Sequence, residues 1–346
     1  MRPLRAEREA PRVSAIRRLG AILGSLAVLL AGPGRAAESP APLTLERVVR
    51  LPDVRGRIDH LAVDLARERL LLAELGNGTL DVVDLRAGRA IGRIPGLDEP
   101  QGVAFVARSD RIVVADGGDG AVRIFRAGDL SPAGEIELGR DADDVRVDPR
   151  SGHVLVGYGG GGLAVIDPVG PAKLADVPLP AHPEGFELDP GSQRIFLNLP
   201  DAREIGVVDP GAGRAIAHWS MRDAGANFPM ALGPGGAQLA VVFRSPPQLV
   251  LLDAKTGTVT RSLETCRDAD DVFFDRSRAR LYVSCGEGVV DVLASDDAGL
   301  HRLQRIATSP GARTSLFVPE MDRLFVAAPA RASGAGAAIL VLRAAP

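Results

Sequence analysis

The chain has 346 residues, of which 46% are hydrophobic and only 4% aromatic, and its formal net charge is −3. Residues 1–36 hold seven Arg and two Glu; without them the chain has 34 basic and 42 acidic side chains, a net charge of −8. Such an acidic excess repels phosphate backbones, which Lys and Arg must neutralise. Composition therefore argues against a nucleic-acid-binding protein.

The N-terminus has the features of an export signal. Six Arg residues precede an apolar run from Leu19 to Leu30, and Gly34-Arg35-Ala36 offers the small-x-small pattern that signal peptidases cleave. The run spans about a dozen residues, fewer than the roughly 20 of a membrane-spanning helix. We predict a signal peptide over residues 1–36 and a periplasmic or secreted protein without a membrane anchor after processing. Arg17-Arg18 also resembles a twin-arginine signal, so the export route stays open.

The remaining chain is a repeat. The segment DADDVRVD at Asp141–Asp148 returns as DADDVFFD at Asp268–Asp275, and three steps of about 42 residues bridge the two copies. The first apolar residue of each copy marks seven units: Leu61, Val103, Val145, Phe186, Met230, Val272 and Leu316. A period of roughly 40 to 45 residues is typical of the blades of a β-propeller.

Each unit contains four short apolar runs separated by turn residues. In the first unit they are Leu61–Asp64, Arg69–Ala73, Thr79–Asp84 and Arg89–Pro95. Runs of this length between turn signals indicate strands, and four strands per unit make one propeller blade. We predict an all-β protein over residues 37–346, a seven-bladed β-propeller with four antiparallel strands per blade.

The two ends of the repeat region complete each other. The seventh unit supplies only three runs, the last of them Ile339–Leu342, and is one strand short. Leu43–Leu51, before the first unit, alternates like a strand but has no blade of its own. We predict that it joins the seventh blade as its outer strand and closes the ring, which removes exposed sheet edges.

Runs such as Arg280-Leu281-Tyr282-Val283-Ser284, with Gly-bearing turns and third strands that end in Asp, resemble the YVTN repeat of exported bacterial propellers, the YncE-like proteins. The resemblance spans residues 43–343. It implies a WD40-like propeller rather than a reaction, because relatives of this architecture include sugar lactonases and quinoprotein-type dehydrogenase subunits. No catalytic motif of the family maps onto this chain.

The innermost strands of a propeller line its central channel, so equivalent positions in the seven units should form rings at one mouth. The positions one and two residues before the markers are rich in carboxylates. Together with a nearby cation, they predict a ligand-binding mouth formed by Asp59, His60, Gln101, Asp143, Asp144, Glu184, Phe228, Asp270, Asp271, Arg313 and Thr314.

Crowded carboxylates cannot all stay ionised without a neutralising group. One alternative is an internal ion network with Arg57 and Arg313. The other is a divalent cation bound by Asp143, Glu184 and Asp270: oxygen ligands alone favour Ca²⁺, whereas the addition of His60 or His182 favours Zn²⁺ or Mn²⁺. Phe228 interrupts the polar ring, either as a plug or as the apolar side of a small-ligand cleft.

A rigid ring that presents loops on one face favours recognition. We therefore expect a monomeric binding or scaffold protein whose acidic mouth contacts a small molecule, a cation or a protein partner. The alternative is a metal-dependent hydrolase of lactonase type, in which the ion polarises a carbonyl group and His60 or His182 moves a proton. No haem-attachment motif is present, so a redox cofactor would have to come from another chain.

The chain contains two cysteines, Cys266 and Cys285. Cys266 lies just before the predicted innermost strand of the sixth unit, and Cys285 ends the second strand of that unit. Both positions belong to the same face of the ring, so we predict a disulfide, which suits an oxidising compartment.

Overall fold

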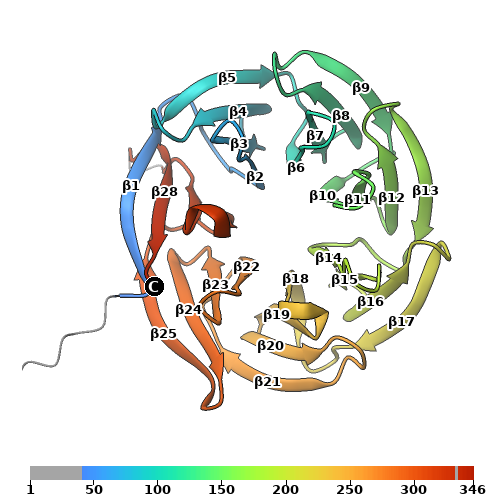
Figure 1. Ribbon diagram of the computed structural model, residues 1–346, viewed down its shortest axis with the longest axis vertical. Coiled ribbons are helices and arrows are strands. Elements are labelled where there is room, and N and C mark those ends of the chain that lie inside the picture. The colour runs from blue at the N-terminus through green and yellow to red at the C-terminus, as the bar shows by residue number, and fades with distance from the viewer. Residues whose placement is uncertain (1–40, 332–333) are drawn as a thin grey trace, which may run out of the picture. The chain divides into compact units, whose positions relative to one another are not determined.

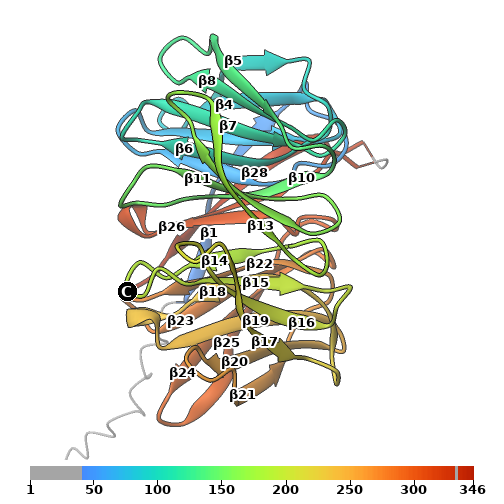
Figure 2. The same cartoon turned by 90° about the vertical axis from the view of Figure 1, so that its right-hand side faces the viewer.

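The computed structural model describes residues 41–331 and 334–346, so the predicted signal peptide lies outside the described residues. The described chain forms seven four-stranded antiparallel sheets that stand radially around a central axis (Figure 1). The predicted seven-bladed β-propeller is thereby confirmed. Seen from the side, the turns between strands lie on two opposite faces of the ring (Figure 2). Within residues 41–331 and 334–346, no helix is long and apolar enough to cross a membrane.

Each blade is built outward from the axis, so that its first strand is the innermost and its fourth the outermost. Blade 1 contains β2 (Leu61–Asp64), β3 (Arg69–Glu74), β4 (Thr79–Asp84) and β5 (Arg89–Pro95). Blade 2 contains β6 (Pro100–Val106), β7 (Arg111–Asp116), β8 (Ala121–Arg126) and β9 (Pro132–Glu137). Blade 3 contains β10 (Ala142–Val147), β11 (Val154–Tyr158), β12 (Gly162–Asp167) and β13 (Ala172–Pro178). Blade 4 contains β14 (Phe186–Leu188), β15 (Ile195–Leu199), β16 (Glu204–Asp209) and β17 (Arg214–Ser220).

Blade 5 contains β18 (Gly225–Leu232), β19 (Gln238–Ser245), β20 (Pro247–Asp253) and β21 (Val259–Glu264). Blade 6 contains β22 (Ala269–Asp275), β23 (Arg280–Cys285), β24 (Val289–Asp296) and β25 (Gly299–Ala307). Blade 7 contains β26 (Ser315–Val318), β27 (Arg323–Ala328), β28 (Ala337–Ala344) and β1 (Leu43–Leu51). Two short 3₁₀ helices, η1 (Pro234–Gly236) and η2 (Pro319–Met321), lie in turns of blades 5 and 7.

Burial follows the radial position of each strand. The second strand β3 is buried at all of its positions, because both faces of its sheet are covered by neighbouring blades. The outermost strand β13 is mostly exposed. Between blades 1 and 2, aliphatic side chains such as Leu71, Val82 and Val114 form one continuous cluster. The core is therefore divided into layers between adjacent blades, which suits a chain rich in small aliphatic residues and poor in aromatic ones.

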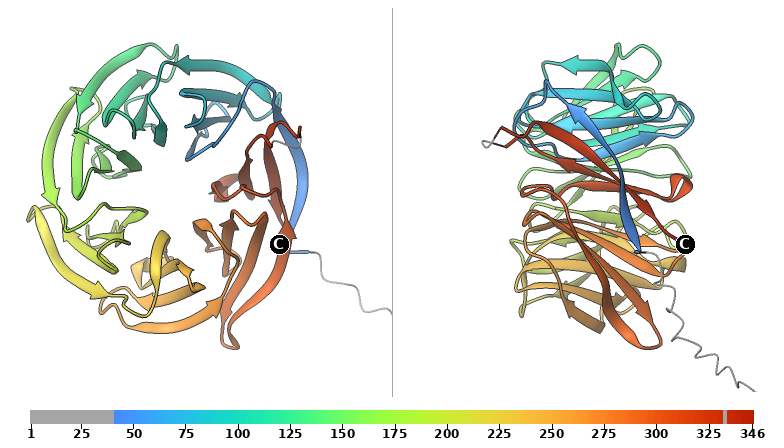
Figure 3. Two further views of the ribbon diagram at one scale, coloured as in Figure 1. Left: turned by 180° about the vertical axis from the view of Figure 1, so that it is seen from behind. Right: turned by 90° about the vertical axis from the view of Figure 1, so that its left-hand side faces the viewer.

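The ring closes as the sequence predicted. Strand β1 pairs antiparallel with β28, from Leu43 opposite Ala344 to Leu51 opposite Ala337 (Figure 3). The side chain of Gln304, on β25 of blade 6, bonds both backbone groups of Leu43, with N–H to Oε1 at 2.8 Å and Nε2 to the carbonyl oxygen at 3.0 Å. The N-terminal strand is therefore held by blade 7 and by its neighbour.

The predicted disulfide between Cys266 and Cys285 is confirmed, with a Cα–Cα distance of 5.9 Å. Both cysteines are buried in the apolar cluster between blades 5 and 6. The bond joins the segment that leads into β22 to the end of β23. It therefore anchors the start of the innermost strand of blade 6.

We predict that replacing both cysteines (Cys266→Ser with Cys285→Ser) lowers the free energy of unfolding by about 3 kcal/mol, because the bond closes a loop of about 20 residues in the unfolded chain. Urea unfolding followed by circular dichroism measures the difference. A reductant should bring the wild-type protein down to the level of the variant and leave the variant unchanged. Equal midpoints for the two oxidised proteins would contradict this prediction.

Candidate functional site

A repeated backbone feature shapes one end of the axis. At the start of β6, β10, β18 and β22, the register against the second strand of the blade shifts by one residue. A β-bulge of this kind leaves one residue unpaired and re-aims the neighbouring side chains. In the same four blades, the residue four positions before the marker adopts a left-handed conformation, with φ values of 54°, 52°, 55° and 58° for Glu99, Asp141, Ala226 and Asp268.

The bulge explains the layout of the two DADD copies. In blade 3, Asp141 takes the left-handed conformation, Ala142 is fully buried, and both Asp143 and Asp144 then face the axis. A strand without a bulge would point two successive side chains to opposite faces. The backbone of the preceding blade comes close at this point: a Cβ atom added to Gly102 would lie 2.0 Å from the carbonyl oxygen of Asp143.

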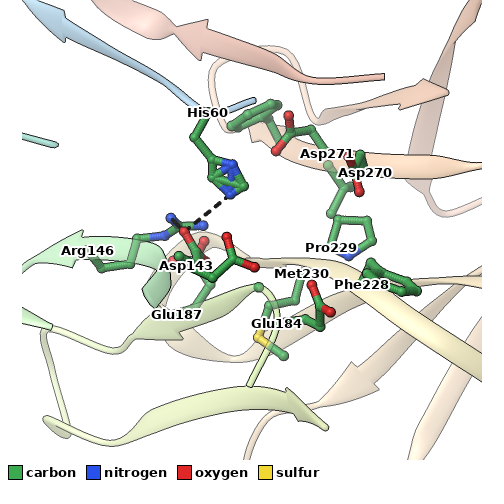
Figure 4. Close-up of a pocket in the computed structure, with 14 residues that line it drawn as sticks. His60, Asp143, Arg146, Glu184, Glu187, Phe228, Pro229, Met230, Asp270 and Asp271 are labelled. Carbon is green, nitrogen blue, oxygen red and sulfur yellow. Dashed lines mark hydrogen bonds and ion pairs between the residues drawn. The ribbon is translucent and has the colours of Figure 1, made fainter. Parts of the chain in front are cut away.

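A cavity lies at this end of the axis (Figure 4). Seven of the eleven residues predicted for the ligand-binding mouth line it: His60, Asp143, Asp144, Glu184, Phe228, Asp270 and Asp271. Arg146 and Glu187, which the repeat positions did not predict, also line it. They lie one residue after their blade markers, and their signal was a charged residue directly after the apolar marker residue.

The other four predicted residues lie around the cavity without lining it. Asp59 is 1% exposed and pairs with Arg57 at 2.9 Å. Thr314 is buried, and its hydroxyl donates to the carbonyl oxygen of Ile58 at 3.0 Å. Gln101 donates to Asp141 at 3.4 Å, and Arg313 forms ion pairs with carboxylates of blade 6.

Arginines neutralise one half of the mouth. The carboxylate of Asp270 pairs with Arg244 and with Arg313, the latter at 2.9 Å, and lies 4.0 Å from Arg57. Asp268 pairs with Arg313 at 3.1 Å. The ion network that the sequence left as one alternative is therefore present around blade 6.

Arg244, from the end of β19, was not anticipated from the sequence. Its guanidinium stacks 3.8 Å from the centre of the Phe228 ring and donates to the carbonyl oxygen of Ala269 at 2.8 Å. Phe228 therefore packs against a cation as well as lining the cavity.

The other half of the mouth holds Asp143, His182 and Glu184, each of which offers a ligand atom within 4.8 Å of the other two. Asp143 and His182 are each 15% exposed, and Asp143 Oδ2 lies 3.7 Å from His182 Nε2. Among the described residues, no Arg or Lys comes within 4.0 Å of Asp143 or Glu184. This half is therefore acidic and has no arginine partner.

Because no arginine pairs with this half, the pKa values of Glu184 and His182 are shifted. Burial and the neighbouring charge of Asp143 raise the pKa of Glu184 to about 8. Burial alone would lower the pKa of His182, but Asp143 and the carbonyl group of Gly159 raise it to about 9. Without a cation, this half holds protons at neutral pH.

Deeper in the cavity, the last Asp of each DADD copy ties its blade to the next. Asp144 accepts the backbone N–H of Phe186 at 3.3 Å, and Asp271 accepts that of Ser315 at 2.6 Å. His60 lies between them, with Nε2 3.6 Å from Asp144. Burial raises the pKa of Asp271 to about 8 and that of Asp59 to about 6.

Together these features define a seven-bladed β-propeller with a polar, titratable cavity at one end of its axis. No family model matches the sequence, and no curated protein matches it.

Solved structures share the fold. A chain of hydrazine synthase from Kuenenia stuttgartiensis superposes with a TM-score of 0.74 at 15% identity, over 85% of this chain and 97% of that chain. A chain of the mitotic checkpoint complex superposes with a TM-score of 0.74 at 14% identity, over 96% of this chain and 99% of that chain. At these identities the likeness shows the fold alone.

The pKa of Asp271 gives a testable pH dependence. Its rise from 3.8 to about 8 means that the folded state keeps a proton that the unfolded chain has lost, so this contribution to stability is complete below pH 3.8 and disappears as the pH rises through about 8. The limiting slope for one proton is about 1.4 kcal/mol per pH unit. An Asp271→Asn variant cannot ionise at this position. We therefore expect its free energy of unfolding to fall less than that of the wild type between pH 5 and pH 8.

Urea unfolding at the two pH values measures the difference. Asp189→Asn serves as the control: burial would raise the pKa of Asp189, but hydrogen bonds from Ser192 and Gly191 outweigh it and lower that pKa, so Asp189 stays ionised throughout this range. Parallel slopes for Asp271→Asn and the wild type would contradict the assignment.

Proposed function

We propose that the protein is an exported, YncE-like binding protein of the periplasm whose channel mouth binds a small cationic ligand. One observation carries the proposal: Arg57, Arg244 and Arg313 gather around the acids of blade 6, while Asp143 and Glu184 have no cationic side chain other than His182 beside them among the described residues. A bound cation would replace the protons that this half holds at neutral pH.

The electrostatics of the mouth support a cation rather than an anion. A carboxyl group that must hold a proton at neutral pH exchanges it for a cation that reaches the same oxygen atoms, because the opposite charge favours the ionised form. The energy of such a contact is larger in a partly enclosed cavity than in bulk water. Phe228 and Met230 line the same cavity and would contact any apolar part of the ligand.

The proposed compartment is supported by the Cys266–Cys285 disulfide, since disulfides persist in oxidising environments. The predicted signal peptide at residues 1–36 agrees with it. We propose a monomer, because the exposed large hydrophobic side chains are scattered singly over the outer strands of several blades, as in Leu174 of β13, Ile216 of β17 and Val259 of β21.

The test is a binding screen on untagged residues 37–346 stripped with a chelator. Divalent metal ions, tetramethylammonium and 1,4-diaminobutane are compared with acetate and succinate by thermal unfolding and calorimetry. A cationic class should stabilise the protein, by about 2.7 kcal/mol at a hundred times its dissociation constant. The stabilisation should vanish in the double variant Asp143→Asn with Glu184→Gln.

Asp268→Asn, a matched change in the half that arginines neutralise, should keep the stabilisation. The proposal is wrong if only the carboxylates bind, or if the double variant responds to cations as the wild type does.

A second candidate function, a lactonase-type hydrolase, is favoured by one observation. His60 lines the same cavity as Asp143 and Glu184, and its Nδ1 atom is buried without a hydrogen-bond partner among the described residues. A cation at those carboxylates could polarise the carbonyl group of a lactone, while His60 moves a proton between the attacking water and the leaving ring oxygen. Asp270, which the sequence grouped with the metal ligands, would instead stay with its arginines.

If the protein is such a hydrolase, His60→Gln should lower kcat for lactone hydrolysis by about 10²-fold and leave cation binding intact, because a general acid–base contributes on that scale. A pH-stat records the acid released by cation-loaded protein with γ- and δ-lactones. Undetectable turnover by the wild type, or equal turnover by the variant, would exclude this second function.

A further inference from the structure

We propose that the cation is a transition-metal ion of the zinc class, bound at the mouth by Nε2 of His182 and by the carboxylates of Asp143 and Glu184. This inference rests on the proposed function and narrows it from a cationic ligand to one chemical class. Three features point to it: the orientation of one imidazole ring, the separations of the ligand atoms and the chemistry of the donor set.

The imidazole of His182 is already oriented for metal binding. Its Nδ1 atom lies 2.6 Å from the carbonyl oxygen of Gly159. A carbonyl oxygen can only accept, so Nδ1 carries a proton, and a metal ion would bind at Nε2 by displacing the second proton of the ring. Metal-binding histidines are commonly held in this way by a carbonyl or carboxylate group behind the ring. Nε2 is the atom that faces Asp143, at 3.7 Å from Oδ2.

The separations of the three ligand atoms fit one ion. An ion about 2.1 Å from each ligand keeps neighbouring ligand atoms roughly 3.0 to 3.5 Å apart and opposite ones about 4.2 Å apart. The distance of 3.7 Å between Nε2 of His182 and Oδ2 of Asp143 lies between the separations of neighbouring and of opposite ligand atoms. All three ligand atoms lie within 4.8 Å of one another. This limit exceeds the separation of opposite ligand atoms by less than the length of one bond, and a small side-chain rotation removes the difference.

The backbone positions of the ligands are fixed by the propeller. Asp143 lies at the bulge of β10, next to Gly102 of the preceding blade. The N–H of Glu184 donates to the carbonyl oxygen of Asn198 at 3.0 Å, which ties the loop before β14 to β15. Pro183 is buried between His182 and Glu184, so two of the three ligands come from the same short segment of the chain.

The donor set distinguishes between metals. Ca²⁺ requires six to eight oxygen ligands, whereas one imidazole nitrogen with two carboxylates suits Zn²⁺, Mn²⁺ or a similar ion. Asp270, which also faces the cavity, is engaged by three arginines and is not free to add its oxygen atoms to the set. Three protein ligands also leave coordination positions open to a small molecule or water in the cavity.

The experiment uses untagged, chelator-treated residues 37–346 and two probes, Zn²⁺ and Co²⁺. Zinc content is measured by elemental analysis after dialysis, and Co²⁺ is titrated in the visible range, where its absorption reports nitrogen and oxygen coordination. We expect one ion per chain, displacement of Co²⁺ by Zn²⁺, and no displacement by a hundredfold excess of Ca²⁺. The variants His182→Gln, Asp143→Asn and Glu184→Gln should each weaken Co²⁺ binding at least tenfold, and Asp268→Asn should not.

Thermal unfolding confirms that each variant is folded, and three independent ligand variants keep the test valid if one of them is not. A Co²⁺ spectrum that is unchanged in His182→Gln would overturn the site, and so would competition by Ca²⁺ at equal concentration. If no metal ion binds but an organic cation does, in a manner that depends on Asp143 and Glu184, this inference fails and the proposed function stands. If no cation of any class binds, both fail.

Discussion

The pairing of β1 with β28 is the interaction on which the rest of the structure depends. Every blade of a propeller has two faces that only neighbouring blades can cover, so the sheets are stable as a closed ring and not as an open row. Blade 7 takes three strands from the C-terminal end of the chain and the fourth from its beginning. Gln304 extends this link to blade 6 by holding the backbone of Leu43 on both sides. The closure therefore connects the two ends of the repeat region directly.

Closure also creates the electrostatic problem at the axis. Seven innermost strands converge there, and bulges in four of them turn consecutive side chains inward. Buried carboxylates are costly unless they are paired, hydrogen-bonded or protonated. The carboxylates at different positions of the DADD motif are compensated by different partners. The last Asp of each DADD copy, Asp144 or Asp271, accepts a backbone N–H of the next blade, so it links two blades.

The third residue of the motif shows that equal sequence does not mean equal function. Asp270 is enclosed by three arginines, whereas its counterpart Asp143 faces His182 and Glu184. The repeat therefore supplies the same backbone and carboxylate in blades 3 and 6, and the neighbouring blades decide whether that carboxylate is neutralised. This difference separates a structural ion network from a candidate binding site within one ring.

The sequence predicted the fold in detail because the fold is encoded locally and repeatedly. A period near 42 residues, four apolar runs per unit, an extra strand before the first unit and a missing strand in the last one specified blade number, strand order and closure. Both cysteines could be assigned because strand register brings their positions to one face. The candidate site was predicted in part: the positions one and two residues before each marker supplied seven cavity residues, but also Asp59 and Thr314, which are buried in contacts around the cavity.

The cavity residues that the sequence did not predict depend on geometry that the position relative to a blade marker does not show. Bulges occur in β6, β10, β18 and β22, and a period-based alignment cannot show which blades contain them. Arg146 and Glu187 lie after their markers, on the continuation of the innermost strands. Arg244 belongs to the second strand of blade 5 and reaches the mouth only because its long side chain crosses the face of Phe228.

The position of Arg244 explains why the mouth remains asymmetric. Its guanidinium is held by the ring of Phe228, by the carbonyl oxygen of Ala269 and by the carboxylate of Asp270, which all lie on the same side of the cavity. With these three contacts, the guanidinium of Arg244 does not pair with Glu184. Its positive charge nevertheless lowers the pKa of Glu184. Burial and the charge of Asp143 outweigh that influence and keep the pKa of Glu184 at about 8. Phe228, the apolar residue in an acidic ring, therefore holds an arginine beside Asp270 rather than beside Asp143 and Glu184.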